Sequence, residues 1–320
     1  MRNTDLHPIR VLVILAAVAA AVIVLFMTVN AKGRWDFILA FRGAKVLSMI
    51  LVAYAIAVST VLFQTVSHNR ILTPSIMGFD ALYGLLQTGL IFALGSAGLG
   101  ALDPRLLFGI EVVTMVAFSS LLYRWLFSGN SRSLHLLLLV GIVFGVLFRS
   151  LAGFMQRIID PNEFVVLQDR LFANFNSVND DLLAVSTAAV VAVSIVGWRM
   201  MHAYDVLALG REAAINLGVD HTRAVTIVLM LVAILISVST ALVGPVTFFG
   251  LLVANLAYQI AGSHKHRFIL PVASLLAVIC IVGGQLVLER IFAFDTALSI
   301  VIEFVGGIVF LALLIRGTAR

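Results

Sequence analysis

Long apolar runs recur along almost the whole chain, and they constrain its fold more than any other feature. About 20 consecutive apolar residues form a helix long enough to cross the hydrocarbon core of a bilayer. Charged residues make up only 12% of the 320 residues, whereas soluble domains carry roughly 25%, so an ordinary wetted surface cannot be built. We predict ten membrane-spanning helices, at residues 11–29, 44–66, 80–98, 105–127, 133–156, 182–200, 223–243, 246–262, 268–288 and 299–316.

The runs follow one another without a linker or a soluble segment. We therefore predict an all-α, polytopic membrane protein in which residues 1–320 form one transmembrane domain. The eighth run, 246–262, is short for a crossing and follows Gly244 and Pro245. Proline lacks a backbone donor and glycine adds conformational freedom. We expect a broken helix there, which a membrane protein tolerates where other protein covers the freed backbone groups.

An even number of spans places both termini on the same side of the membrane. Arg2 and Arg10 precede the first run, and basic residues favour the cytoplasmic side. That run is also too long for the apolar region of a cleaved signal peptide. We expect cytoplasmic N- and C-termini, which makes the loops at 205–222 and 262–267 cytoplasmic as well. One basic cluster then falls outside, against the trend: Lys32, Arg34, Arg42 and Lys45.

Several function classes are excluded by composition and motif. The 21 Lys and Arg residues give a net charge of +5, but they are spread over short loops and form no stripe for nucleic acid. No G-x-x-x-x-G-K-[ST] motif is present, so any ATP hydrolysis must occur on another chain. The single cysteine, Cys280, gives no disulfide framework. We interpret His264 and His266 as a solvated loop pair, and we predict no metal site, no cofactor and no catalytic grouping.

Three ionisable residues fall inside predicted spans, where such residues are costly and are functional candidates by default. They are Glu111, Arg149 and Glu303. Arg149 lies late in its span and can extend toward the interface. Each carboxylate fits interhelical hydrogen bonding, and each also fits proton or ion coupling in a secondary transporter of a small substrate. Both interpretations stay open at this point.

The segment 205–223 is a small polar island between two long apolar runs, with glycines at Gly210 and Gly218. We predict a short helix–turn–helix with Arg211 and Glu212 in solvent and one apolar face, formed by Val206, Leu207, Leu209, Ala213, Ala214 and Leu217. Glycine permits tight turns or close approach of another backbone. The segment is either a docking element for a soluble partner or an interfacial helix without one.

The longest outer connection, 157–181, has the features of a short surface helix. Asp160 and Pro161 form a favourable helix start, and Glu163 places a carboxylate in the first turn. Leu167, Leu171 and Phe175 follow at helical spacing and share one face. We predict an amphipathic helix on the outer surface.

Four blocks of residues, in this order, resemble the FecCD family, the permeases of ABC importers for iron–siderophore complexes, haem and cobalamin. The blocks are Arg42-Gly43-Ala44-Lys45; Gln64 with Asn69, Pro74 and Gly78; Gly210-Arg211-Glu212-Ala213-Ala214 to Gly218, with Gly244-Pro245 and Phe249-Gly250-Leu251; and Asp295 with Gly306-Gly307. Together they cover residues 40–316. The stretch 73–80 looks like a subgroup that serves catecholate-type ferric siderophores.

The chain also departs from the family pattern. Where the family has an Asn-Pro pair, this chain has Asn69-Arg70, and where the family has Pro-His, this chain has Ala254-Asn255. The outer run at 173–178 also differs from the family pattern throughout. Another class of ABC permease shares a Glu-Ala-Ala-x-x-x-Gly loop, but it continues with a motif that residues 228–231 lack. The span count and this departure favour the siderophore type.

The resemblance implies the type II ABC importer permease fold, in a bacterial cell (inner) membrane. It implies three protein partners besides membrane lipid: an ATP-binding ABC subunit, a second permease (a sister subunit or a second copy), and a periplasmic or lipoprotein siderophore-binding protein. It assigns ATPase coupling to Gly210, Arg211, Glu212, Ala213, Ala214 and Gly218, and docking of the binding protein to Arg42 and Arg290. It assigns the translocation path to Gly141, Gly145, Glu303, Gly306 and Gly307.

Overall fold

The computed structural model describes residues 7–29, 35–128, 134–176 and 179–290, together with residues 301, 302, 304, 307 and 308. Every regular element in these ranges is a helix. The elements are α1 Pro8–Thr28, α2 Trp35–Ser67, the 3₁₀ helix η1 Pro74–Met77, α3 Phe79–Gly100, α4 Pro104–Ser128, α5 Leu134–Gln156, α6 Pro161–Leu171, α7 Asp180–Arg199, α8 Met201–Leu207, α9 Arg211–Asn216, α10 His221–Val243, α11 Phe249–Ile260 and α12 His266–Arg290.

Within the described ranges, eight helices are long and apolar enough to cross a membrane: α1, α2, α3, α4, α5, α7, α10 and α12. The helix α11 is apolar but has only 12 residues. The predicted span at 299–316 lies almost entirely outside the described residues. The all-α membrane class is therefore confirmed, whereas the total of about ten spans stays a prediction.

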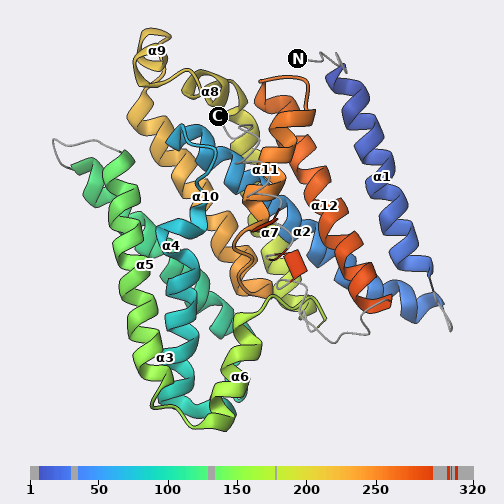
Figure 1. The fold of residues 1–320 in the computed structure, drawn as a ribbon, viewed down its shortest axis with the longest axis vertical. Coiled ribbons are helices and arrows are strands. Elements are labelled where there is room, and N and C mark those ends of the chain that lie inside the picture. Colours follow the sequence, from blue (N-terminus) through green and yellow to red (C-terminus); the bar gives the residue numbers. More distant parts are fainter. Residues whose placement is uncertain are drawn as a thin grey trace.

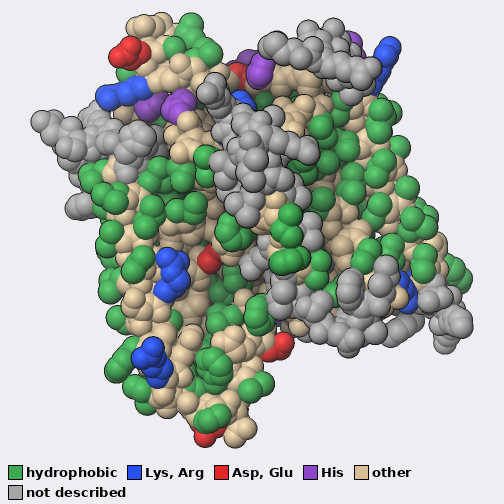
Figure 2. All heavy atoms as spheres, viewed as in Figure 1, with side chains coloured by type: hydrophobic (Ala, Val, Ile, Leu, Met, Phe, Trp, Pro, Cys, Tyr) green, Lys and Arg blue, Asp and Glu red, His purple; other side chains and the backbone are tan. Residues whose placement is uncertain are grey.

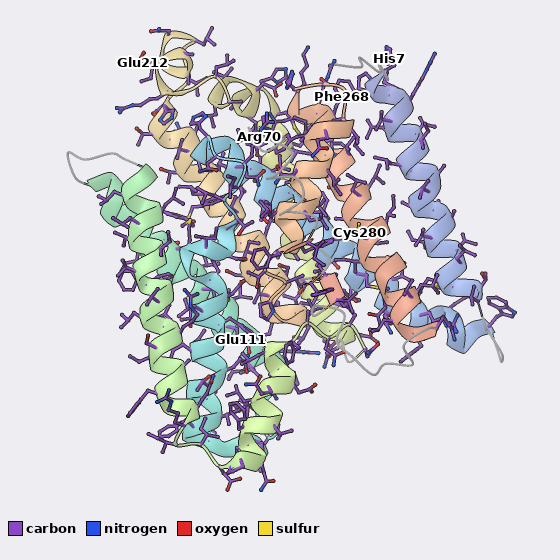
Figure 3. All side chains as sticks on the ribbon, in the orientation of Figure 1. His7, Arg70, Glu111, Glu212, Phe268 and Cys280 are labelled. Carbon is purple, nitrogen blue, oxygen red and sulfur yellow. The ribbon has the colours of Figure 1, made fainter. Side chains whose placement is uncertain are left out.

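The helices form a bundle with two distinct ends (Figure 1). One end, here called the α9 end, carries α8 and α9 and the beginnings of α1 and α12. The opposite end, the α6 end, carries α6 and the last turns of α1 and α12. Figure 3 places Glu212, Arg70, Phe268 and His7 toward the α9 end. Hydrophobic side chains cover much of the flanks, while histidines gather at the α9 end (Figure 2).

The core is built around α2 and α10, and α1 lies at the periphery. In the most apolar window of α2, 83% of the residues are buried, against 17% in α1. Helix α2 packs on α10, α11 and α12, while α1 packs mainly on α12. Helix α2 begins at Trp35, well before the predicted start at residue 44. Its first turns carry Arg42 and Lys45, whose polar ends bond to neighbouring helices, so charge does not interrupt the helix.

The predicted break before the eighth span is present. Helix α10 ends at Gly244, whose φ of +97° lies in the left-handed region that favours glycine. Helix α11 starts only at Phe249. It then packs very closely on α2, because a Cβ added at Gly250 would lie 2.1 Å from Thr60 Oγ1. The short span is therefore covered by α2, as its freed backbone groups require.

The predicted outer helix is also present, as α6. Asp160 caps its start by accepting a hydrogen bond from the Asn162 backbone N–H at 2.8 Å, and Leu167 is fully buried. The helix ends at Leu171, so Phe175 lies beyond it, although Phe175 is buried too. Glu163 accepts hydrogen bonds from the backbone N–H and hydroxyl of Ser96, where α3 is kinked.

Candidate functional site

The helix–turn–helix predicted at 205–222 is formed by α8 and α9, which lie at the extreme of the α9 end (Figure 1). Gly210 sits between the two helices with φ +99°, and Gly218 follows α9 with φ +81°. Apart from its chain neighbours, a Cβ added at either glycine would meet no atom within 4 Å in the described part of the chain. Both glycines are therefore required by backbone conformation, not by crowding within the chain.

The apolar residues of this segment do not form one buried face, which corrects part of the prediction. Leu207 and Ala214 are buried against the bundle. Leu209 and Leu217, expected on the same face, are instead 64% and 61% exposed, and Ile215 is 53% exposed. Arg211 and Glu212 are exposed as expected. The segment thus presents apolar and charged side chains outward together.

A polar contact that the sequence did not indicate attaches α8 to the bundle. Asp205 Oδ1 accepts hydrogen bonds from the His266 backbone N–H at 2.8 Å and from His266 Nδ1 at 2.7 Å. On the other side of the ring, Nε2 lies 2.7 Å from Thr65 Oγ1 of α2. His266 is only 2% exposed, which corrects the interpretation of His264 and His266 as a solvated pair. Among the described residues, no His, Cys, Asp and Glu cluster could hold a metal ion.

The two arginines predicted to dock a binding protein meet at the α6 end. Arg42 Nη1 donates to the backbone carbonyl oxygens of Phe26, Met27 and Val29, at 3.1, 3.0 and 3.0 Å. Arg290 Nη2 donates to the Val29 carbonyl oxygen at 2.9 Å. Cations are favoured at a helix C-terminus, where the last carbonyls lack partners. The two arginines therefore hold α2 and α12 to the end of α1.

Beside them lies a buried polar cluster around Lys45. Its ammonium contacts the Glu289 carboxylate and the Asn176 side-chain oxygen, and Gln285 Nε2 donates to Glu289 Oε1 at 3.0 Å. Lys45 and Gln285 are both buried. Sequence reasoning assigned Lys45 to an exposed outer cluster, whereas the structure pairs it inside the bundle. The sequence does contain the matching carboxylate, Glu289, near the end of the apolar run that forms α12, and this residue could have indicated the pair.

The glycines assigned to the translocation path are only partly described. A Cβ added at Gly141 would lie 2.9 Å from Met77 Cα, and one added at Gly145 would lie 3.3 Å from Gly78 Cα. These two glycines of α5 therefore allow close approach of the turn at η1 within the same chain. Gly307 is partly exposed, and a Cβ added there would meet none of the described atoms within 4 Å. Glu303 and Gly306 lie outside the described residues, and the path assignment stays a prediction.

Glu111, the candidate for ion coupling, lies between α3 and α4 and is 3% exposed. Its Oε1 accepts a hydrogen bond from Gln87 Nε2 at 2.5 Å. The amide oxygen of Gln87 is buried and has no partner among the described groups. Figure 3 shows Glu111 in the half of the bundle toward α6. The contact fits interhelical hydrogen bonding, one of the two interpretations left open by the sequence.

Comparison with known proteins agrees with this geometry. The chain matches the FecCD transport family over residues 9–316. It is 49% identical over 284 residues to the petrobactin import system permease protein YclO of Bacillus subtilis (strain 168), covering 89% of this chain and 90% of that protein. It is 37% identical over 278 residues to the petrobactin import system permease protein FatC of Bacillus anthracis, covering 87% of this chain and 78% of that protein.

Among solved structures, the chain is similar to a metal-chelate type ABC transporter in an inward-facing conformation. The TM-score is 0.85 at 20% sequence identity, and the match covers 97% of this chain and 99% of the other. At that identity the likeness establishes the fold and nothing finer. With the family match spanning nearly the whole length and the two permeases above 30% identity, the chain belongs to the FecCD transport family.

Proposed function

We propose that this chain is the permease subunit of a bacterial ABC importer that carries a ferric siderophore, petrobactin or a close analogue, into the cytoplasm. The observation that carries the proposal is the 49% identity to a petrobactin import permease over 89% of this chain. The iron chelate is the cargo. The chain has no nucleotide-binding motif of its own, so a separate ATP-binding subunit supplies the energy.

The segment α8–α9 is the surface that meets the ATP-binding subunit. It projects from the bundle (Figure 1) and exposes Leu209, Ile215 and Leu217 next to Arg211 and Glu212. Closure of the ATP-binding subunit would displace this segment and move bundle helices as rigid bodies between two access states. This role makes the α9 end cytoplasmic and places both termini in the cytoplasm, in an inner or cell membrane.

Charge at the two ends supports that orientation. Exposed basic residues border the loops of the α9 end: Arg70, Arg199, Arg211, Arg223, Lys265 and Arg267. Basic residues in short loops favour retention in the cytoplasm. At the α6 end, Lys45 and Arg105 are paired with the carboxylates of Glu289 and Asp181, while Arg157 and Arg290 are exposed there as well.

The α6 end would then receive the siderophore-binding protein, with Arg42 and Arg290 facing its carboxylates, a geometry that the guanidinium fork suits. A second permease, either a copy of this chain or a sister subunit, completes the path. We assign this contact to the exposed apolar face of α5, which carries Ile142, Val143, Val146, Leu147, Leu151 and Phe154.

The test is uptake of radioactive iron bound to petrobactin by a bacterium that lacks its own siderophore permeases. The strain expresses this chain with a petrobactin-binding protein and an ATP-binding subunit. We expect uptake that stops on ATP depletion and persists when the membrane potential is collapsed. The opposite pattern would establish an ion-coupled carrier. Excess haem or cobalamin should not compete. Transport of haem or cobalamin without any uptake of ferric petrobactin would overturn the substrate assignment.

A further inference from the structure

Two described helices, α8 and α10, connect α9 to the rest of the bundle. Helix α9 packs on α8 and α10, whereas α8 packs in addition on α2, α7 and α12. A force applied to the exposed end of α9 can therefore pass to α2 and α7 through either helix, whereas the contact with α12 is made by α8. The contacts of α8 determine which helices receive the share of this force that passes through it.

Two cavities border α8. A cavity of about 400 Å³ is bordered by Asp205, Ala208 and Leu209 of the α8 region. A smaller cavity of about 80 Å³ is bordered by Met201 and Tyr204. The Tyr204 hydroxyl is buried and has no partner among the described groups, and burial raises the pKa of this phenol, so it stays neutral. Free volume therefore lies next to α8 at both places, although Tyr204 and Leu207 themselves are buried.

Close packing is what lets protein interiors transmit displacement. Where α8 borders a cavity, side chains can move without pushing a neighbour, so packing there transmits little. The two hydrogen bonds that Asp205 accepts transmit displacement better than this packing, because their donor and acceptor atoms lie only 2.7 to 2.8 Å apart. They attach α8 directly to the first residue of α12.

The contact continues from α12 to α2 through one imidazole. A carboxylate only accepts hydrogen bonds, so the ring nitrogen facing Asp205 carries the proton. In the neutral ring, Nε2 then accepts from the Thr65 hydroxyl at 2.7 Å. The hydroxyl has a single proton, and the Val61 carbonyl oxygen, 2.9 Å from the same Oγ1, competes with Nε2 for it. Asp205, His266 and Thr65 therefore form an unbroken polar chain across α8, α12 and α2.

We propose that Asp205 is a positioning residue of the transport cycle, through which displacement of α8 and α9 reaches α12 and α2 by way of His266 and Thr65. The inference rests on the proposed function, since it presumes an ATP-binding subunit that moves α9. It adds a residue outside the exposed coupling surface. The two cavities supply the free volume in which α8 moves, and the polar chain determines which helices follow.

The chain offers a matched control for the test. Asp220 lies at the same end of the bundle and caps α10 by accepting a hydrogen bond from the Arg223 backbone N–H at 3.1 Å. Asp205→Ala and Asp220→Ala each remove a carboxylate that accepts from a backbone N–H at a helix start, which costs on the order of 1 kcal/mol. Asp205→Ala also leaves the buried Nδ1–H of His266 without its acceptor, so it should be the less stable of the two. Only Asp205→Ala breaks the connection to α12 and α2.

The experiment uses the assembled importer in proteoliposomes, with ferric petrobactin, the binding protein and ATP. The quantity measured is iron transported per ATP hydrolysed. For Asp205→Ala we expect this ratio to fall about tenfold while ATP hydrolysis continues, within the range of measured coupling between sites. For Asp220→Ala we expect the wild-type ratio. Asp205→Asn keeps an oxygen acceptor in place and should retain most of the ratio.

A second variant keeps the test decisive if Asp205→Ala does not fold. Thr65→Val is nearly isosteric and removes only the hydroxyl that joins His266 to α2, so it should lower the same ratio. Wild-type ratios in Thr65→Val and in a folded Asp205→Ala would overturn the inference. Failure of the proposed function looks different, because the wild-type importer itself would then show no ATP-dependent uptake of ferric petrobactin.

Discussion

The contact between Gly250 of α11 and Thr60 of α2 gives the sharpest prediction on stability. A Cβ added at Gly250 would lie 2.1 Å from Thr60 Oγ1, 3.1 Å from Thr60 Cβ and 3.1 Å from Ile56 Cγ2. Thr60 is 1% exposed, so little room exists for it to move. Gly250→Ala must therefore push α11 away from α2 or force the threonine into another rotamer.

Overpacking of this kind costs about 1–3 kcal/mol, and a separation of 2.1 Å places this site toward the upper end. Replacing glycine by alanine within a helix otherwise contributes up to about 1 kcal/mol. Gly153→Ala in α5 isolates that contribution, because nothing lies within 4 Å of a Cβ there. We expect Gly250→Ala to be less stable than Gly153→Ala by about 2–3 kcal/mol, which corresponds to roughly 4–6 °C in Tm at about 2 °C per kcal/mol.

The assay is thermal unfolding of the purified permease in detergent, followed by tryptophan fluorescence. Thr60→Ala removes the clashing oxygen, so the double variant should recover at least about 1 kcal/mol relative to the sum of the single changes, as contacting residues do in double-mutant cycles. Equal melting temperatures for Gly250→Ala and Gly153→Ala, or strict additivity with Thr60→Ala, would refute the packing argument.

Three further predictions concern function and stability. Gly218→Val should abolish iron uptake with membrane insertion intact, because φ is +81° there; normal uptake would remove its coupling role. Glu111→Gln should keep uptake, since an amide can still accept from Gln87, and loss of uptake would revive ion coupling. Lys45→Met should lower the free energy of unfolding by about 3–5 kcal/mol, because it leaves the Glu289 carboxylate without its cation. Adding Glu289→Leu should restore most of that stability, which the melting temperatures of the single and double variants would show.

Much of the fold follows from the sequence because a bilayer demands long apolar helices. Helices lie at every predicted position up to 268–288, although α11, within 246–262, has only 12 residues, and the break at Gly244 and the surface helix after Asp160 are present too. Local signals decide each of these: run length, a residue that permits positive φ, and a capping side chain. The start of α2 was missed because Arg42 and Lys45 look like loop residues until their partners are known.

The candidate site was predicted less completely, and the reason is distance along the chain. Asp205 and His266 are 61 residues apart, and His266 and Thr65 are 201 apart. No periodicity or motif connects such residues; only the packing of three helices brings them together. For the same reason His266 looked solvated, because it stands in a polar loop sequence beside Lys265 and Arg267. Burial of a loop-edge side chain depends on which helix covers it.

The attachment of α1 by Arg42 and Arg290 has a mechanical consequence. It fixes the far tips of α1, α2 and α12 to one another, so those helices can swing only about that fixed point. Helix α12 has 25 residues and is therefore about 37 Å long. A tilt of about 5° around a tip held by Arg290 would carry its opposite tip, at His266, through about 3 Å. A small rotation about one end of the bundle would thus become a displacement of a few ångströms at the other end.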